Sequence, residues 1–359
     1  MFLKLRVSFC LVSVLFVGNA EAQQTSLPNI ILIVTDDQGY ADVGFNGSID
    51  IPTPNIDQIA HNGVIFEEGY VTYAVCGPSR AGLITGRYQD KFGFSRNPLL
   101  AVNDPDMGLP LLETTLADAT RSKGYVTKAI GKWHLGAHES LHPLKRGFDE
   151  FYGFLSGGHR YFPEEWTLND LSEAKDQWDG YRTKLLNNRT RVTESEYLTD
   201  ALSREAVSFI ARKADEPFFL YLAYNAPHAP LQATQKYLDR FPNIQDKKRK
   251  TYAAMVSAVD DGVGMVVDAL RQSNALENTL IIFLSDNGGP EKVNASDNGL
   301  LRGGKGDFYE GGVRVPFAMQ WSAKIPKGIR YDKPIISLDI FATIANIIDY
   351  TPSAEKPLD

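Results

Sequence analysis

The chain has 359 residues, of which 43% are hydrophobic, so it is long enough to bury a core that stabilises it unaided. Its formal net charge at pH 7 is −7, and no long run of lysine and arginine occurs along it. This balance argues against nucleic acid as a partner, and an anionic substrate would have to be drawn by a local basic pocket.

The amino terminus has the organisation of an export signal. Lys4 and Arg6 precede an apolar run at 7–17 that is too short to cross a bilayer, and Ala20 and Ala22 provide the small residues that a signal peptidase reads. We therefore predict a signal peptide over residues 1–22 and an exported protein without a membrane span. Its destination would be periplasmic or secreted, or lysosomal or extracellular in a eukaryote.

The first predicted strand covers residues 29–35, an uninterrupted apolar and β-branched run typical of the centre of a parallel sheet. It ends at Asp36 and Asp37. Ligands bind beyond the carboxyl ends of strands in open α/β sheets, so these adjacent acids are candidate ligands of a hard metal ion. A helix cap or a turn is the alternative. A short helix at 54–61 and a strand at 64–66 follow.

Cys76 begins the run Cys-Gly-Pro-Ser-Arg, and once the signal peptide is removed it is the only cysteine left, so no internal disulfide can form. Pro78 suits the first turn of a helix, which would place Cys76 at the amino end, where backbone N–H groups favour an anion. Arg80 would lie nearby on that helix. The alternative is that Cys76 is a small buried hydrophobe.

A helix at 114–123 and a strand at 125–130 lead to Lys132 and His134, two residues apart, so both side chains are expected on one side of the strand. Residues 160–190 show no clear period and are interpreted as a loop or insertion. A helix at 196–212 and a buried strand at 218–224 then deliver His228.

A long helix at 251–270 precedes a strand at 279–284, which ends at Asp286 and Asn287. A glycine-rich stretch at 301–312 surrounds Lys305. An apolar strand follows Pro316, and a helix covers 335–348. The alternation of strands and helices predicts one doubly wound α/β domain.

The Cys76 motif, the following Leu-Ile-Thr-Gly-Arg at 83–87 and the Lys305 loop with its Tyr-Glu-Gly-Gly tail at 309–312 resemble the formylglycine-dependent (type I) sulfatases. The resemblance implies an alkaline phosphatase-like fold, with a mostly parallel sheet flanked by helices, and a sulfatase catalytic domain over 23–359. Family members usually continue into a smaller C-terminal subdomain. We therefore expect this chain to be truncated at its C-terminal end.

The resemblance also implies the chemistry. A formylglycine-generating (sulfatase-maturing) enzyme would oxidise Cys76 to an aldehyde, whose hydrate attacks the sulfate sulfur. His228 would protonate the leaving alcohol, and His134 would accept the proton that expels sulfate. Arg80, Lys132 and Lys305 would hold sulfate and formylglycine oxygens. One divalent cation, most often calcium, would be bound by Asp36, Asp37, Asp286 and Asn287 and would contact position 76. These oxygen ligands suit a hard ion rather than zinc.

The stretches 44–48 and 146–161 are similar to arylsulfatase B-like enzymes and to bacterial carrageenan sulfatases. This similarity favours a sulfated galactose-type sugar, either carrageenan-like or a glycosaminoglycan 4-sulfate. His159 and Arg160 would contact the sugar or a neighbouring sulfate, unless they belong to a surface loop.

Two alternatives remain open. A phosphatase or phosphodiesterase of the same superfamily would need two transition metals and many more ligands, whereas the chain has six histidines, and His61, His138 and His142 lack zinc-site spacing. A catalytically silent sugar-binding relative would normally have lost Cys76, a histidine or a metal ligand, and all of these are present.

Overall fold

The computed structural model describes residues 27–359, and the predicted signal peptide lies outside this range. Its main sheet has ten strands in the order β11-β2-β10-β9-β1-β8-β4-β5-β6-β7, and a second, two-stranded sheet pairs β12 with β3. The strands are β1 (Asn29–Thr35), β2 (Val64–Phe66), β3 (Gly69–Tyr70), β4 (Val126–Lys132), β5 (Glu150–Phe154), β6 (Leu185–Asn187), β7 (Thr190–Val192), β8 (Phe218–Ala223), β9 (Thr279–Ser285), β10 (Phe317–Gln320), β11 (Ile329–Tyr331) and β12 (Ile335–Ile336).

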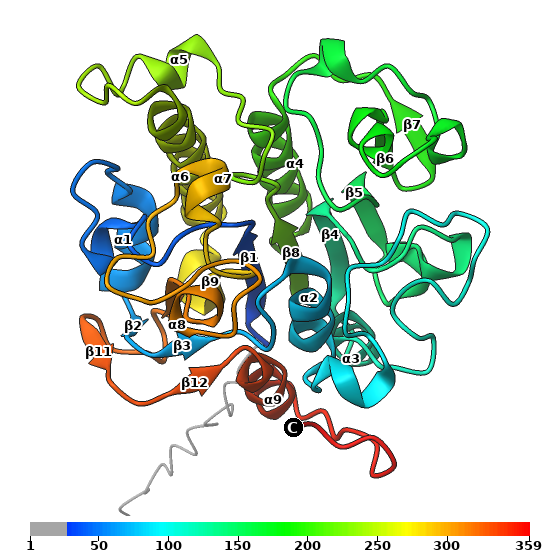
Figure 1. Ribbon diagram of the computed structural model, residues 1–359. Helices are drawn as coiled ribbons and strands as arrows, with labels where there is room; N and C mark the ends of the chain where they lie inside the picture. The colour runs from blue at the N-terminus through cyan, green and yellow to red at the C-terminus, as the bar shows by residue number, and fades with distance from the viewer. Residues whose placement is uncertain (1–26) are drawn as a thin grey trace, which may run out of the picture.

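The helices cover both faces of this sheet (Figure 1). They are α1 (Pro54–His61), α2 (Cys76–Thr85), α3 (Leu116–Ser122), α4 (Leu198–Lys213), α5 (Gln235–Leu238), α6 (Lys247–Gln272), α7 (Glu291–Asn294), α8 (Glu310–Val313) and α9 (Leu338–Ile347).

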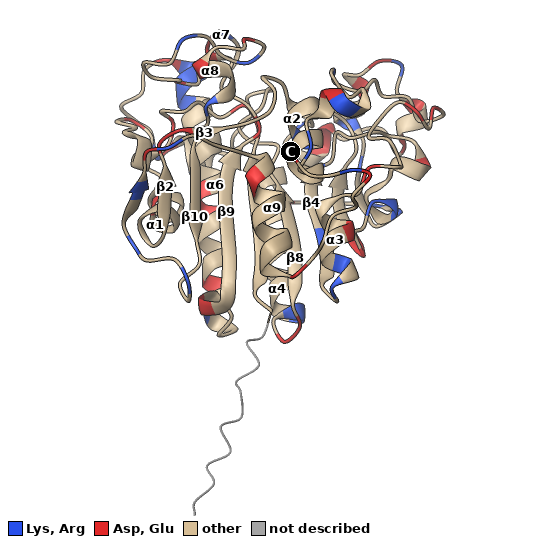
Figure 2. Ribbon diagram, turned by 90° about the horizontal axis from the view of Figure 1, so that it is seen from below, with Lys and Arg blue, Asp and Glu red and all other residues tan. Residues whose placement is uncertain are grey.

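The central strand β1 feeds two hydrophobic cores because successive side chains of a strand point to opposite faces. Ile31 and Ile33 join the core that contains residues of α1, α4 and α6. Ile30, Leu32 and Val34 join the core on the other face, with residues of α2, α3 and α9. Every residue of β1, β8 and β9 is buried, and none is charged; viewed from below, the charged residues of α4 and α6 stand out against these strands (Figure 2).

The predicted doubly wound, mostly parallel sheet is confirmed. The five central strands, β9, β1, β8, β4 and β5, are mutually parallel, and antiparallel strands occur only toward the two edges of the described sheet. The stretch 160–190, interpreted as a loop or insertion, contains β6 and the first residue of β7, which extend one edge of the sheet. Periodicity did not identify the short strand β5, and residues 335–336 are a strand rather than the start of α9.

Candidate active site

The sheet register brings the polar strand ends together. Thr35 of β1 pairs with Ser285 of β9, so Asp36 and Asp286, which directly follow these strands, lie side by side. The backbone N–H of Asp286 donates to the Thr35 carbonyl at 3.0 Å. Lys132 is the last residue of β4, one position beyond the Gly131–Ala223 pair with β8. The carboxyl ends of four strands that are distant in sequence thus lie next to one another, where ligands bind in open α/β sheets.

Asp37 leaves the strand in a left-handed conformation, with φ of 63°. Such a backbone is costly for a non-glycine residue, and outliers of this kind cluster at functional sites. The turn is held by the Asp37 N–H, which donates to Asp286 Oδ1 at 3.3 Å, and by Asn287 Nδ2, which donates to Asp37 Oδ1 at 2.8 Å. The turn directs the Asp37 carboxylate toward the same space as Asp36.

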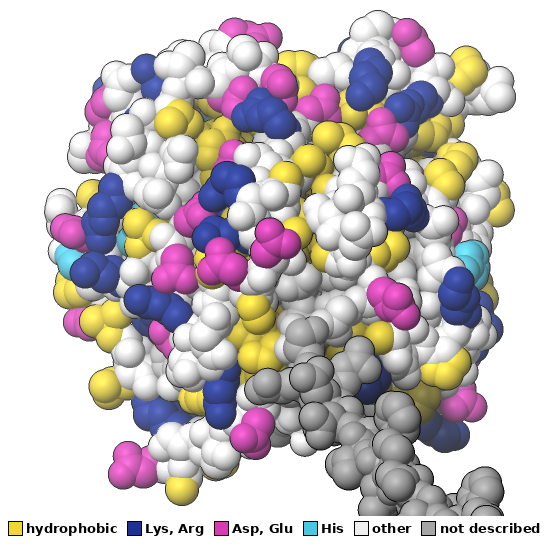
Figure 3. All heavy atoms as spheres, turned by 180° about the vertical axis from the view of Figure 1, so that it is seen from behind, with side chains coloured by type: hydrophobic (Ala, Val, Ile, Leu, Met, Phe, Trp, Pro, Cys, Tyr) yellow, Lys and Arg dark blue, Asp and Glu magenta, His cyan; other side chains and the backbone are white. Residues whose placement is uncertain are grey.

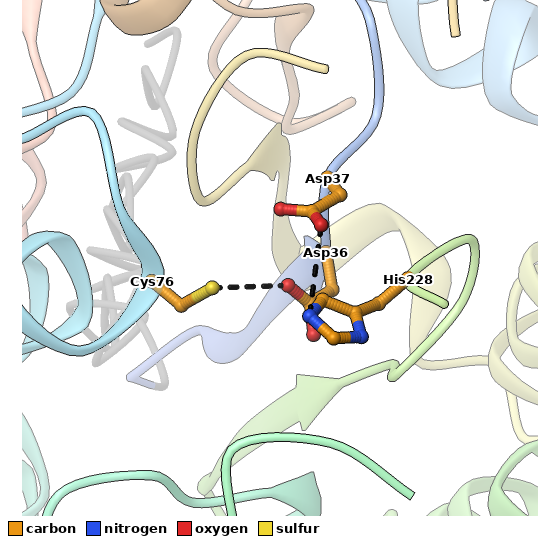
Figure 4. Close-up of side chains that lie close together, drawn as sticks. All are labelled: Asp36, Asp37, Cys76 and His228. Atoms are coloured by element: carbon orange, nitrogen blue, oxygen red, sulfur yellow. Dashed lines mark hydrogen bonds and ion pairs between the residues drawn. The ribbon is translucent and has the colours of Figure 1, made fainter. Parts of the chain in front are cut away.

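Cys76 is the first residue of α2, as the motif suggested, although the helix begins two residues before Pro78. The first intrahelical bond joins Ser79 N–H to the Val75 carbonyl, so Pro78 occupies a position whose N–H is not needed. Cys76 Sγ lies 3.4 Å from Asp36 Oδ1. In Figure 4 the Cys76 thiol points at the two aspartates from one side and His228 approaches them from another.

Three cationic side chains face the three carboxylates. Lys132 Nζ lies 2.5 Å from Asp36 Oδ2, and Lys305 Nζ lies 2.7 Å from Asp37 Oδ1. Arg80 Nε donates to Asp286 Oδ2 at 2.8 Å, and both side chains are fully buried. Burying isolated charges is costly, so this group is tolerated only because opposite charges are paired.

The two predicted histidines line the same site from different loops. His228 Nε2 lies 3.6 Å from Asp37 Oδ2, and its Nδ1 lies 2.5 Å from the Ala229 carbonyl. Since a carbonyl only accepts, Nδ1 carries the proton and Nε2 faces the site. His134 has φ of 57°, so the two-residue strand period assumed for Lys132 and His134 is wrong. A β-carbon at Gly157 would lie 2.6 Å from His134 Nε2, so only glycine permits this approach.

Burial and charge shift the pKa values of these groups in opposite directions. Burial raises the pKa of the Cys76 thiol to about 12, against the opposing charges of Lys132 and Lys305. Burial would also raise the pKa of Asp37, but Lys305 and His228 lower it to about 2. Burial, with Asp36 adding to it, raises the pKa of Asp286 to about 6. The carboxylates therefore repel one another despite their cationic neighbours.

Several buried polar atoms at this centre have no hydrogen-bond partner. They are Asn287 Oδ1, an Arg80 terminal nitrogen (NH2) and His134 Nδ1. Buried polar atoms without a partner are rare in folded proteins and indicate a ligand-binding or other functional role. Asp36, Asp37, Cys76 and His228 offer ligand atoms that all lie within 4.8 Å of one another. The oxygen donors that fit a hard divalent cation are Asp36 and Asp37 of this group, with the Asp286 carboxylate and the free Asn287 amide oxygen next to Asp37.

The site lies in a cavity of about 510 Å³, within the range of pockets that hold small-molecule ligands. Asp37, Cys76, His134, His228 and Lys305 line it. Arg80 and Lys132 lie beneath this lining, fully buried.

The two residues predicted to contact the sugar, His159 and Arg160, lie in different surroundings. Arg160 lines the cavity, and its contact with a sugar stays a prediction. His159 is fully buried outside the lining, with its ring nitrogens 2.8 and 2.7 Å from the carbonyls of Arg160 and Thr183. Its position corrects the expectation of a sugar contact, because the ring is fully buried and both nitrogens face backbone carbonyls instead of the cavity. Sequence reasoning also missed Trp178 and Tyr181, which line the cavity from the stretch without a period.

Comparison with known proteins gives the class. The sulfatase family model matches residues 28–350, and the chain belongs to this family, which confirms the predicted resemblance. Among solved structures, the chain is similar to Ps i-CgsB, crystallised in complex with k-i-k-neocarrahexaose. The two sequences are 47% identical, and the structures superpose with a TM-score of 0.88 over 93% of this chain and 74% of that one.

Two curated relatives are each 33% identical to the chain. They are the uncharacterised sulfatase YdeN of Escherichia coli, matched over 92% of this chain, and the N-acetylgalactosamine-6-sulfatase of Canis lupus familiaris, matched over 95%. The match covers 64% and 66% of these relatives, so the chain spans slightly less than two thirds of their length.

Proposed function

We propose that this protein is a sulfuric ester hydrolase that removes a sulfate group from a carbohydrate. The observation that carries the proposal is the position of Cys76. It begins α2 inside the Cys-Gly-Pro-Ser-Arg motif and lines the cavity, with its sulfur 3.4 Å from one of three buried carboxylates that face three cationic side chains. This arrangement suits a negatively charged reacting group and a bound cation together.

The candidate metal ligands are Asp36, Asp37, Asp286 and Asn287, together with the group at position 76. The fit rests on the mutual repulsion of the carboxylates and on the unpartnered Asn287 Oδ1. A calcium ion held there would supply Lewis-acid stabilisation of the charge that develops on the sulfate oxygens. In the structure Lys132, Lys305 and Arg80 balance the carboxylates, so a cation would free these side chains for an anionic substrate.

Cys76 itself is poorly suited to act as a thiolate, since burial keeps its thiol protonated. We propose that a sulfatase-maturing enzyme oxidises it to formylglycine, an aldehyde whose hydrate would offer one hydroxyl as nucleophile and a second for release of sulfate. The start of α2 holds this position beside Asp36, and the Gly77 N–H is fixed by Asn97 Oδ1 at 2.8 Å.

The basic side chains take the roles of substrate binding. Lys305 borders the cavity, while Arg80 and Lys132 support it from below, where they stabilise negative charge in a site with little water. His228 presents Nε2 to the cavity while Nδ1–H stays bonded to the Ala229 carbonyl. Burial lowers its pKa to about 3, so it would have to take up a proton on Nε2 with the bound substrate before delivering it to the leaving oxygen. His134, on the opposite loop, is the candidate for accepting the proton that releases sulfate.

A sulfated galactose-type saccharide is the proposed substrate. The similarity at 44–48 and 146–161 supports it, as does the relative crystallised with a neocarrahexaose and the relative named for N-acetylgalactosamine 6-sulfate. None of the described helices is long and apolar enough to cross a membrane. We propose that the predicted signal peptide directs the enzyme to export.

The alternative of a two-zinc phosphatase gains no support from the site. Within residues 27–359, the group of side chains arranged to hold a metal contains a single histidine, His228.

The test combines mass spectrometry with a release assay. The peptide that carries position 76 should have the mass of the aldehyde, and the same preparation should release sulfate from a sulfated galactose oligosaccharide. A fully active preparation whose position 76 titrates as a free thiol would refute the proposal. Release of phosphate from the matching phosphate ester, with two zinc ions per chain, would favour the phosphatase.

A further inference from the structure

Large apolar side chains gather at the mouth of the cavity that holds the candidate active site. Leu99, Trp178 and Val293 all line the cavity, and each is about 60% exposed: 61%, 63% and 60%. Exposed apolar groups that rim a polar pocket mark a contact surface for a ligand. A sulfate group alone would occupy only a small part of the cavity of about 510 Å³ and would not need to contact these three side chains.

Aromatic rings connect this mouth to the reacting centre. The rings of Trp178 and Tyr181 meet edge to face at 5.4 Å, and the ring of Tyr181 meets that of His228 at 6.3 Å. Tyr181 therefore lies between the exposed Trp178 and the proposed proton donor. Leu100 packs against Gly180, where a β-carbon would lie 2.6 Å from its side chain, so segments 97–100 and 177–181 form one continuous wall.

Arg160 adds a positive charge to this wall. Its backbone N–H donates to the Tyr181 carbonyl at 2.9 Å, and its NH1 pairs with Glu165 at 2.5 Å. The guanidinium has no other protein acceptor within residues 27–359, and its side chain is 42% exposed. Asp37, the one acid among the described residues that line the cavity, is paired with Lys305, and Arg160 keeps guanidinium N–H groups that Glu165 does not use, so these can bind an anionic group at the mouth.

We propose that Leu99, Arg160, Trp178 and Tyr181 form a second sugar-binding position, which we call the rim subsite. It would hold the sugar unit next to the one whose sulfate is removed. A pyranose ring presents apolar C–H faces that pack on an aromatic side chain, and Arg160 would bind an anionic group on that neighbouring unit. The anionic group is a sulfate ester or a carboxylate. This proposal rests on the proposed sulfatase activity and deepens it.

The test compares substrates that differ in reach. An aryl sulfate, 4-methylumbelliferyl sulfate, has no neighbouring sugar unit and serves as the reference substrate. A sulfated galactose disaccharide also reaches the rim subsite, and its neighbouring unit is supplied neutral, sulfated or as a uronic acid. The measured quantity is the ratio of kcat/KM for each disaccharide to kcat/KM for the aryl sulfate, which cancels differences in active-enzyme fraction.

For Trp178→Ala this ratio should fall about tenfold for all three disaccharides, because packing on the ring does not depend on charge. Trp178 is largely exposed, so the variant should fold; Trp178→Phe, which retains a ring, should recover part of the loss. An unchanged ratio in Trp178→Ala would overturn the subsite.

The Arg160 variant is tested by comparing the disaccharides whose neighbouring unit is charged with the neutral one. Because Arg160→Ala would also leave Glu165 unpaired, the double variant Arg160→Ala/Glu165→Gln isolates the loss of the guanidinium. The ratio should fall about 10- to 100-fold for whichever anionic disaccharide is recognised and little for the neutral one. Equal ratios on all three disaccharides would overturn the role of Arg160.

The matched control is Arg182→Ala. Arg182 directly follows Tyr181, and its side chain is 39% exposed, similar to that of Arg160. It also pairs with an acid, Asp179, but it does not line the cavity. Its ratios should equal those of the wild type. Failure of the wild type to hydrolyse any of the four sulfates would reject the proposed function itself. Hydrolysis with ratios that the rim variants leave unchanged would reject the subsite alone.

Discussion

Two clusters of charged side chains differ in how their polar atoms are satisfied. In the candidate active site, Asn287 Oδ1 and an Arg80 nitrogen have no partner. In the second cluster, Arg249 of α6 bonds to both oxygens of Asp50 at 2.7 and 2.9 Å and to Asp42 at 2.6 Å. We call Asp42, Asp50, Arg249 and Tyr252 the Arg249 cluster.

The Arg249 cluster is complete without any ligand. Asp42 Oδ2 accepts from the Tyr252 hydroxyl at 2.6 Å and from the backbone N–H groups of Gly39 and Asp297, and Arg249 also donates to the Ala295 carbonyl. None of its side-chain atoms is left buried without a partner. Burial of charge therefore does not by itself identify a functional site. What distinguishes the active site is buried charge with atoms left unpaired.

This contrast also separates the site from the outer surface. On the face shown in Figure 3, basic and acidic side chains are interspersed among neutral ones, as expected for solvated charges. If the contrast is correct, changes in the active site should remove activity and spare the fold. Changes in the Arg249 cluster should do the opposite.

The largest effect is expected at position 76. Cys76→Ala should abolish turnover, because it removes the group that supplies the nucleophile, while the cooperative unfolding transition is retained. Sulfate release and a thermal melt on the same preparation would check both halves. Measurable turnover by a pure Cys76→Ala protein would show that the nucleophile lies elsewhere.

Removal of the metal should have a comparable effect. A chelator should abolish sulfate release, calcium should restore it, and calcium should raise the melting temperature, since a ligand at 100 times its Kd stabilises the fold by about 2.7 kcal/mol. Asn287→Leu, similar in shape but without the unpartnered oxygen, should lose most of this calcium-dependent shift. Full activity in excess chelator would contradict the assignment.

The proton donor should show a dependence on the leaving group. His228→Ala should lower kcat for a sugar sulfate by roughly 10²–10⁴-fold, the usual contribution of one acid or base, and should affect an activated aryl sulfate less. The exposed His61 on α1 provides the control substitution, which should affect neither substrate. Equal losses on both substrates would assign His228 to binding rather than to proton transfer.

The smallest effect on turnover, and a large one on stability, is expected for Arg249→Met. Loss of the guanidinium leaves Asp42 buried and unpaired, which should cost about 3–5 kcal/mol of unfolding free energy, while kcat per folded molecule changes little. Urea unfolding and active-site-normalised kinetics would measure the two. A loss of kcat without a loss of unfolding free energy would contradict the prediction that the Arg249 cluster supports stability rather than activity.

The pH dependence of the same variant has a definite sign. Burial raises the pKa of Asp42 to about 6, against the lowering effect of Arg249, from an ordinary value of 3.8. A raised pKa means that stability is greatest while the folded carboxyl can hold its proton and falls as pH rises through the folded value. Without Arg249 that pKa should rise further, so the variant should lose more stability relative to the wild type at pH 8 than at pH 5.

Much of this architecture could be predicted because it depends on local sequence patterns, namely apolar runs, the residues that follow them and one motif. The buried runs that became β1, β8 and β9 were read within a residue or two, since strands covered on both faces are continuously apolar. The residues just beyond them, Asp36, His228 and Asp286, followed from the rule that ligands bind at the carboxyl ends of parallel strands. The motif at Cys76 identified the family, which the comparison confirmed.

Other features depended on contacts between distant segments, which a local pattern does not encode. The pairing of Thr35 with Ser285, 250 positions apart, decides that Asp36 meets Asp286. The fold also turned His159 into the core and placed Trp178 and Tyr181 in the cavity wall, although His159 directly precedes the stretch without a period that contains the other two. The sequence by itself therefore determined which residues have chemistry to offer and where strands end. Only the tertiary structure decided which of them face one cavity, because that depends on sheet register and loop packing across the whole chain.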